Sequence, residues 1–319
     1  MKRTILAALL IGCLTSPQAQ ESVGEPSALA CNDFRAGAAS VLATAPDALQ
    51  VNNLLFEASR KGCVGALEAL LKAGASHLAR DRMGNTALAI AAKMGRLATV
   101  ESLLASASTD EAAQLDRANV DGATPLIQAV LANRDEVAKR LIVAGAQVDA
   151  ADKQGETALS VAAFNANVEV ASLLLARKAR PDTVDATGKG VILYAAARGS
   201  APIVEMLLDA GIDPNARYRA DLTALMWAAG HPDNTSMDAA LRTVELLLSR
   251  GAKVALIDDR GRDALMIAAG LGHAAIAQAL LDAGADRTLR DKAGKSAFDL
   301  AAAPDVKAVI GGRDVAEPR

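Results

Sequence analysis

The amino-acid sequence predicts an all-α repeat protein, a solenoid of about eight helix-turn-helix units. Two features of the order of residues predict this fold class: a short motif recurs with a period of 33 residues, and paired alanines stand at the same place in successive periods. The third is composition, because the chain is 51% hydrophobic but only 2% aromatic, so Ala, Leu, Val and Ile must fill its core. Although a chain of 319 residues would ordinarily suggest two domains, stacked repeats form one elongated domain.

The period is clearest in a motif of the form Gly-x-Thr-Ala-Leu. It occurs as GNTAL at 84–88, as GATPL at 122–126 and as GETAL at 155–159. Between the last residues of successive motifs, five of the seven intervals are 33 residues long, and the other two are 38 and 40. The residues compared are Leu55, Leu88, Leu126, Leu159, Ile192, Leu225, Leu265 and Phe298. The two long intervals predict loop insertions in the second and sixth units.

Each period carries a turn signal, a helix cap and two helical segments in a fixed order. Asp152 and Gly155 suit a tight turn, because Asp bonds to nearby backbone and Gly accepts a positive φ. Thr157 stands where its side-chain oxygen can accept a hydrogen bond from the first free amides of a helix. The alanine pair 162–163 keeps that first helix thin, and Gly145 is placed to end a second helix. Equivalent caps are predicted at Thr86, Thr124 and Thr223, and equivalent helix ends at Gly74, Gly211, Gly251 and Gly284.

This combination resembles the ankyrin-repeat family, whose unit runs Asp-x-x-Gly-x-Thr-Pro-Leu-His-x-Ala-Ala, followed by an apolar helix and Gly-Ala-Asp. The resemblance covers residues 50–310 in eight units, and the stretches 152–182 and 259–286 carry nearly all of it. It implies protruding β-turn fingers, a concave face lined by the first helices, and protein binding at that face. The chain departs from the family in lacking the histidine after Thr-Pro-Leu in every unit, and in having Asp221 where the sixth turn needs glycine.

The N-terminal residues have the features of an export signal. Lys2 and Arg3 precede an apolar run that is too short to span a bilayer. Cleavage after a signal peptide at 1–19 would give a periplasmic protein, whereas Leu10 to Cys13 resembles the lipobox of bacterial lipoproteins. In that alternative the signal is 1–12, Cys13 is acylated, and the protein is anchored in the outer membrane facing the periplasm.

After the signal we expect a linker at 20–30, a capping helix at 31–49, the repeat domain at 50–310 and a tail at 311–319. Either processing route leaves the two cysteines Cys31 and Cys63 in a compartment that permits disulfides. We therefore predict a disulfide that ties the N-terminal segment to the first repeat. The alternative is that the two cysteines are unrelated small apolar residues.

Catalytic, metal and nucleic-acid functions find no support in the sequence. The net charge is −3 and no basic patch is interleaved with aromatic residues. His77, His231 and His273 lie far apart in the chain, without Cys, Asp or Glu at metal-ligand spacing, and we expect His273 to be structural. We accordingly expect no catalytic residue, no metal site and no cofactor.

The resemblance leaves an exposed surface as the functional feature. We predict a non-enzymatic, monomeric, protein-binding scaffold of the bacterial envelope, similar to exported bacterial ankyrin-repeat proteins, that touches a membrane only if Cys13 is acylated. Trp227 stands where the family has an apolar residue, so we expect it to pack. The alternative is a small-ligand or regulatory binding protein with a groove around Phe164, Arg198 and His231. The predicted partner-binding residues are Arg217, Tyr218, Arg219, His231, Arg260, Arg262, Phe164 and Arg198.

Overall fold

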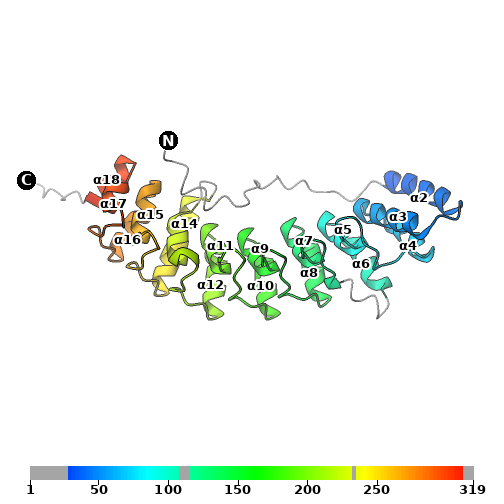
Figure 1. Ribbon diagram of the computed structural model, residues 1–319, viewed down its shortest axis with the longest axis horizontal. Helices are drawn as coiled ribbons and strands as arrows, with labels where there is room; N and C mark the ends of the chain where they lie inside the picture. Colours follow the sequence, from blue (N-terminus) through cyan, green and yellow to red (C-terminus); the bar gives the residue numbers. More distant parts are fainter. Residues whose placement is uncertain (1–27, 108–114, 232–234, 312–319) are drawn as a thin grey trace, which may run out of the picture.

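The chain forms an elongated stack of helices that runs from α2 at one end to α18 at the other (Figure 1). The computed structural model describes residues 28–107, 115–231 and 235–311. The expected signal at 1–19, Cys13, nearly all of the expected linker and residues 312–319 of the tail lie outside the described residues. Within those residues, no helix is long and apolar enough to cross a membrane.

Within the described residues, eight helix pairs follow one another along the stack, which agrees with the prediction of about eight units. The first and second helices of the pairs form two layers, and a loop joins each pair to the next. The pairs are α3 (Ala48–Lys61) with α4 (Val64–Lys72), α5 (Ala87–Met94) with α6 (Leu97–Ser106), α7 (Pro125–Leu131) with α8 (Asp135–Val143), α9 (Ala158–Phe164) with α10 (Val168–Ala176), α11 (Val191–Ala197) with α12 (Ala201–Asp209), α13 (Ala224–Ala229) with α14 (Met237–Ser249), α15 (Ala264–Leu271) with α16 (Ala274–Asp282), and α17 (Ala297–Leu300) with α18 (Pro304–Gly311).

The alanine pairs lie where neighbouring units meet. All ten predicted alanines have an exposed fraction of 0%, so none of them faces solvent. Leucines such as Leu126 and Leu174 are also at 0% and fill the space between the layers. Because the small side chains on the first helices let backbones approach closely, one continuous core runs through every pair. The alanines compared are Ala91, Ala92, Ala162, Ala163, Ala195, Ala196, Ala228, Ala229, Ala268 and Ala269.

The predicted helix caps are present. The hydroxyl of Thr157 accepts a hydrogen bond from the amide of Ser160 at 3.2 Å, and Thr86, Thr124 and Thr223 act in the same way. Asp263 and Ser296 replace threonine in the last two units, whereas the cap residue before α11 is Gly190, which has no side chain to accept a hydrogen bond. The predicted helix ends Gly74, Gly145, Gly211, Gly251 and Gly284 all have positive φ angles between 87° and 96°.

Long side chains also join each unit to the one before it. The Nε of Arg134 donates to the carbonyl of Lys93 at 3.4 Å. The side-chain Nδ2 of Asn165 donates to the carbonyl of Val130 at 2.9 Å. The stem of Arg134 crosses Gly95, where a Cβ atom would lie only 2.7 Å from the arginine Cδ. Gly95 also has a φ of 72° as the cap of α5, so this contact between units requires glycine on two grounds.

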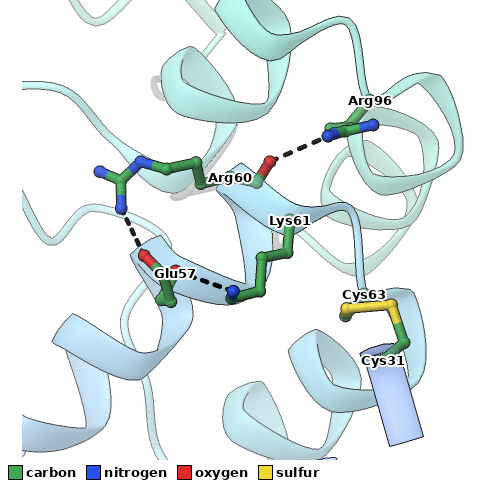
Figure 2. Close-up of a disulfide and its surroundings, with 6 residues drawn as sticks. All are labelled: Cys31, Glu57, Arg60, Lys61, Cys63 and Arg96. Atoms are coloured by element: carbon green, nitrogen blue, oxygen red, sulfur yellow. Dashed lines mark hydrogen bonds and ion pairs between the residues drawn. A yellow bond between two sulfur atoms is a disulfide. The ribbon is translucent and has the colours of Figure 1, made fainter. Parts of the chain in front are cut away.

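A further helix, α2 (Ala28–Leu42), packs against the first unit. It begins before the expected range of 31–49 and ends within it, because Asp47 caps the start of α3 through a hydrogen bond from Gln50 at 2.8 Å. Only Ala38 of α2 is buried. Figure 2 shows a covalent link between α2 and the first unit: the sulfur atoms of Cys31 and Cys63 lie 2.06 Å apart, with Cys63 as the N-cap residue of α4.

The Cys31–Cys63 pair gives a first prediction. Because α2 buries little apolar surface, we expect Cys31→Ala, or reduction of the native protein, to raise amide hydrogen exchange across residues 28–42 at least tenfold. By chain entropy, a bond that closes a loop of this length is worth about 3 to 4 kcal/mol. Exchange in α9 and α10 should be unchanged. Two free thiols in the unfolded, unreduced protein would contradict the prediction.

The buried cap of α15 gives a second prediction, on pH. Burial raises the pKa of Asp263 to about 6, and the residue is 1% exposed. A folded-state pKa above the unfolded value favours the folded state at low pH, and this contribution is lost as the pH rises from about 4 to 6. Threonine keeps the cap without the charge. As the pH rises from 4.5 to 7.5, the unfolding free energy of Asp263→Thr should increase by about 1 to 3 kcal/mol relative to that of the native chain.

Urea unfolding of both chains at the two pH values measures this difference. The matched control is Thr223→Asp, which should introduce the opposite dependence at the start of α13. A stability difference that is the same at both pH values would show that Asp263 is not the titrating group.

Candidate protein-binding surface

A row of tight turns borders the first helices on one side of the stack. We call each turn a finger and number it by the helix pair that it precedes, so that finger 4 is residues 152–156 and finger 5 is residues 185–189. In finger 4, Asp152 Oδ1 accepts hydrogen bonds from the amides of Gln154 and Glu156, both at 2.9 Å. The same two bonds form at Asp81, Asn119, Asp185, Asp258 and Asp291.

Successive fingers are joined by one backbone hydrogen bond each. These bonds hold the fingers in a continuous row beside α5, α7, α9, α11, α13 and α15. They run from Val120 to Met83 (2.9 Å), Lys153 to Asp121 (2.9 Å), Ala186 to Gln154 (2.7 Å), Arg219 to Gly188 (3.1 Å), Asp259 to Ala220 (3.0 Å) and Lys292 to Arg260 (3.0 Å), with the amide named first.

Finger 6 (residues 218–222) is built differently from the others. Tyr218 stands where the other fingers have Asp or Asn, and its amide still donates to the carbonyl of Leu222 at 3.0 Å. Ala220 and Asp221 have φ angles of 62° and 58°, a conformation that costs a non-glycine residue about 1 to 2 kcal/mol. The replacement of glycine by Asp221, noted in the sequence, therefore corresponds to a distorted turn.

The missing cap at Gly190 is explained by the same finger. The ring of Tyr218 lies against Gly190 so closely that a Cβ atom there would be 2.1 Å from the tyrosine Cε1. A threonine at 190, as in the equivalent caps, would collide with the ring. Burial raises the pKa of the Tyr218 hydroxyl, so this group is protonated at neutral pH. Fingers 5 and 6 are thus matched to each other by two departures from the repeat.

Aromatic side chains gather on the first helices of units 4 to 6. The rings of Phe164 on α9 and Tyr194 on α11 meet edge to face, with their centroids 6.0 Å apart. Trp227 occupies on α13 the position that Tyr194 has on α11. Two cations complete the group: Lys189 Nζ lies 5.7 Å from the Tyr194 ring and 5.8 Å from the Trp227 ring, and Arg198 Cζ lies 5.8 Å from the Phe164 ring. We call these five residues the ring cluster; all five are half-buried.

Tyr194 is anchored by finger 5. Its hydroxyl donates a short hydrogen bond to Asp185, and Thr187 donates to the same carboxylate at 2.7 Å. Burial, and next the bond to Asp185, raise the pKa of Tyr194 well above its ordinary value. Burial and then the charges of Asp152 and Asp185 also raise the pKa of Glu156, which Lys189 opposes. The carboxylate of Asp185 is therefore already engaged by Tyr194 and Thr187.

The predicted finger arginines have different surroundings. Arg260 contacts Asp258 at 2.6 Å, and Arg262 contacts Asp291 of the next finger at 2.9 Å. Both carboxylates are nearly inaccessible, so these ion pairs neutralise charges that the fingers bury. Arg217 is 3.4 Å from an exposed carboxylate. Arg219 is exposed and forms no ion pair within the described residues.

The histidines are arranged differently from what their distance in the sequence suggests. The rings of His231 and His273 are stacked, with their centroids 4.1 Å apart, and both residues are buried. His273 begins α16, and its Nδ1 lies 2.8 Å from the carbonyl of Ala229 in the preceding unit. Its predicted structural role is confirmed. His231 is 5% exposed, so it offers little surface to a partner.

The sequence analysis identified Phe164 and Arg198 as binding residues but missed Tyr194 as a member of the ring cluster. A signal was present, because Tyr194 and Trp227 are 33 residues apart and so stand in register. Trp227 was expected to pack, and it does so in part. Across the described ranges, no group of three or more His, Cys, Asp or Glu residues could hold a metal ion.

Comparison with known proteins agrees with this architecture. A family model described as ankyrin repeats (3 copies) matches residues 108–185, 192–291 and 234–310, and a model for a single ankyrin repeat matches residues 83–114. The crystal structure of the ankyrin repeat domain of Bcl-3, a member of the IkappaB family by its title, is similar with a TM-score of 0.55 and 28% identity. The match covers 70% of this chain and 97% of that one.

Two curated relatives share a shorter region. The mouse and human proteins named Ankyrin repeat domain-containing protein 63 are each 42% identical over 88 residues, which is 28% of this chain. The match spans only 22% of the length of those relatives. Since the family models cover most of residues 83–310 and the fold has the same repeating unit, the chain belongs to the ankyrin-repeat family.

Proposed function

We propose that the protein is a non-enzymatic scaffold of the bacterial envelope that binds another protein with its fingers and the adjoining face of the first helices. The observation that carries this proposal is the unbroken row of fingers joined by backbone hydrogen bonds. Such a row presents many side chains at fixed spacing, as protein recognition requires.

Exposed apolar side chains on and beside the fingers support the proposal. The exposed fractions are 53% for Met83, 43% for Val120, 50% for Val184 and 38% for Ile257. These residues come from four different fingers or their flanks, so apolar surface is distributed along the row. A protein partner can cover such a surface, whereas a small molecule would contact only one part of it.

The envelope location rests on the N-terminal sequence and on the cysteines. Residues 1–19 have a basic start and an apolar run, and the Cys31–Cys63 geometry suits an oxidising compartment. A periplasmic protein is the simpler proposal, and a lipoprotein acylated at Cys13 is the alternative.

The small-ligand alternative has weaker support. It needs a groove at Phe164, Arg198 and His231, but Arg198 lies over the Phe164 ring and His231 is stacked on His273. Two open hollows are present elsewhere on the described surface. One lies between α12 and α14 and the other between fingers 7 and 8, and neither is lined by these three residues.

Photo-crosslinking in intact envelopes tests the proposed surface. A photo-reactive amino acid at position 120 or 184, on the finger side, should crosslink one protein reproducibly. The same amino acid at the exposed position 245 of the second-helix layer serves as the control. We expect at least five times more crosslinked partner from the finger positions than from position 245.

Charge reversal separates the arginines of this surface. Arg219→Glu should reduce partner capture at least fivefold, since Arg219 is exposed and free of ion pairs in the described chain. The matched control is Arg242→Glu, at an exposed arginine on α14, which should leave capture unchanged. Equal loss in both variants, or no crosslinked protein from any finger position, would contradict the proposed function.

A further inference from the structure

The ring cluster differs from the rest of the surface in its use of aromatic residues. The chain has only seven aromatic residues (four Phe, two Tyr and one Trp), and three of them lie together on the first helices of consecutive units. Other units have Ile90, Gln128, Val161 or Ile267 at the position of Tyr194 and Trp227. Since residues without rings satisfy the packing there, packing alone does not require the aromatic side chains. Half-buried aromatic side chains are common anchors of protein interfaces.

The cations of the cluster form no direct ion pair within the described residues, although the charge of Lys189 acts on Glu156. Across the described residues, Lys189 and Arg198 form no ion pair, whereas Arg250, Arg260 and Arg262 each contact at least one carboxylate. The acidic neighbour Asp185 is engaged by Tyr194 and Thr187, as described above. The two positive charges are therefore held beside aromatic faces and are not neutralised by ion pairs with this chain.

The remaining polar groups of the cluster are also donors. Arg198 Nε and Trp227 Nε1 find no acceptor among the described residues. Both of these atoms are covered by protein, so the groups that can meet a partner are Lys189 Nζ and the terminal nitrogens of Arg198. A site with aromatic faces and an excess of N–H donors is complementary to an anionic acceptor.

We propose that the ring cluster is the centre of the interface and that it receives a carboxylate-bearing segment of the partner protein. This inference rests on the proposed function and names the chemistry of the partner. Acidic side chains of the segment contact Lys189 and Arg198, and flanking apolar groups cover the faces of Tyr194 and Trp227. The distorted finger 6 fits this placement, because it lies against finger 5 and strained backbone concentrates at functional sites.

A defined peptide library tests the inference. The full chain is screened against random 15-residue peptides displayed on phage, and the enriched peptides are synthesised with each Asp or Glu in turn replaced by Asn or Gln. Fluorescence anisotropy then measures Kd for each peptide. We expect the enriched peptides to contain an acidic residue whose replacement weakens binding at least tenfold, with an affinity that falls as salt rises.

Single substitutions test whether the enriched peptides bind at the ring cluster. Lys189→Met removes the charge but keeps the apolar stem, and it should weaken binding at least tenfold, as should Trp227→Leu. Lys153→Met, at an exposed lysine on finger 4, is the matched control and should change Kd less than twofold. Circular dichroism and thermal melting check that each variant is folded. If Lys189→Met unfolds the chain, Arg198→Gln provides the same test.

A charge exchange gives the sharpest result. Lys189→Glu should lose the acidic peptide and gain a peptide in which the critical Asp or Glu is replaced by Lys. Enriched peptides without an acidic residue, or a peptide Kd that stays unchanged in both the Lys189 and the Arg198 variant, would overturn the inference while leaving the scaffold function intact. Failure of the library to yield any binder, together with no crosslinked protein in envelopes, would overturn both.

Discussion

The fold depends on how closely the first helices of neighbouring units approach each other. Two alanines in each of five units occupy this contact, and all of them are fully buried. The third unit has Ala129 and Val130 there. A side chain larger than valine would push two units apart and strain the contacts on both sides, because each unit packs mainly against its immediate neighbours. The low aromatic content follows from the same constraint. A core this thin has room for leucine between the layers but little room for rings.

The fingers are organised by backbone geometry, and finger 6 shows how far this geometry can be changed. Its tyrosine replaces the usual acidic side chain, and Gly190 provides the space that the ring occupies. The hydrogen bonds to fingers 5 and 7 are nevertheless kept. The row therefore stays continuous at the place where its chemistry differs most from the repeat. A surface that keeps its shape while its side chains change is well suited to recognising a particular partner.

Most of the fold could be predicted because it follows from local rules that recur with every unit. Thr157, the buried alanine pairs and the glycines at the helix ends each act within one unit or between adjacent units at a fixed register. The start of α2 could not be placed, because this helix lies outside the repeat and has no cap signal before Cys31.

The site was predicted only in part, since its contacts depend on how one unit is rotated against the next. Tyr194 and Lys189 come from one unit and meet Phe164 and Trp227 from the two neighbours. The stacking of His231 on His273 was hidden by the insertion in the sixth unit, which shifts the spacing from 33 to 40 residues. Arg262 was predicted to bind a partner, and the sequence did not show that its guanidinium contacts the buried carboxylate of Asp291 in the next finger.

The position of α2 has a consequence for the length of the assembly. A stack of similar modules has no inherent end, because the surface that receives one module can equally receive the end of another molecule, and such head-to-tail contacts propagate into open filaments. Helix α2 covers one terminal surface of the described stack and turns Asn32, Asp33 and Arg35 to the solvent. Helix α2 therefore blocks head-to-tail stacking at that end. Because the Cys31–Cys63 pair holds α2 in place, the oxidation state of the protein determines whether that end is covered.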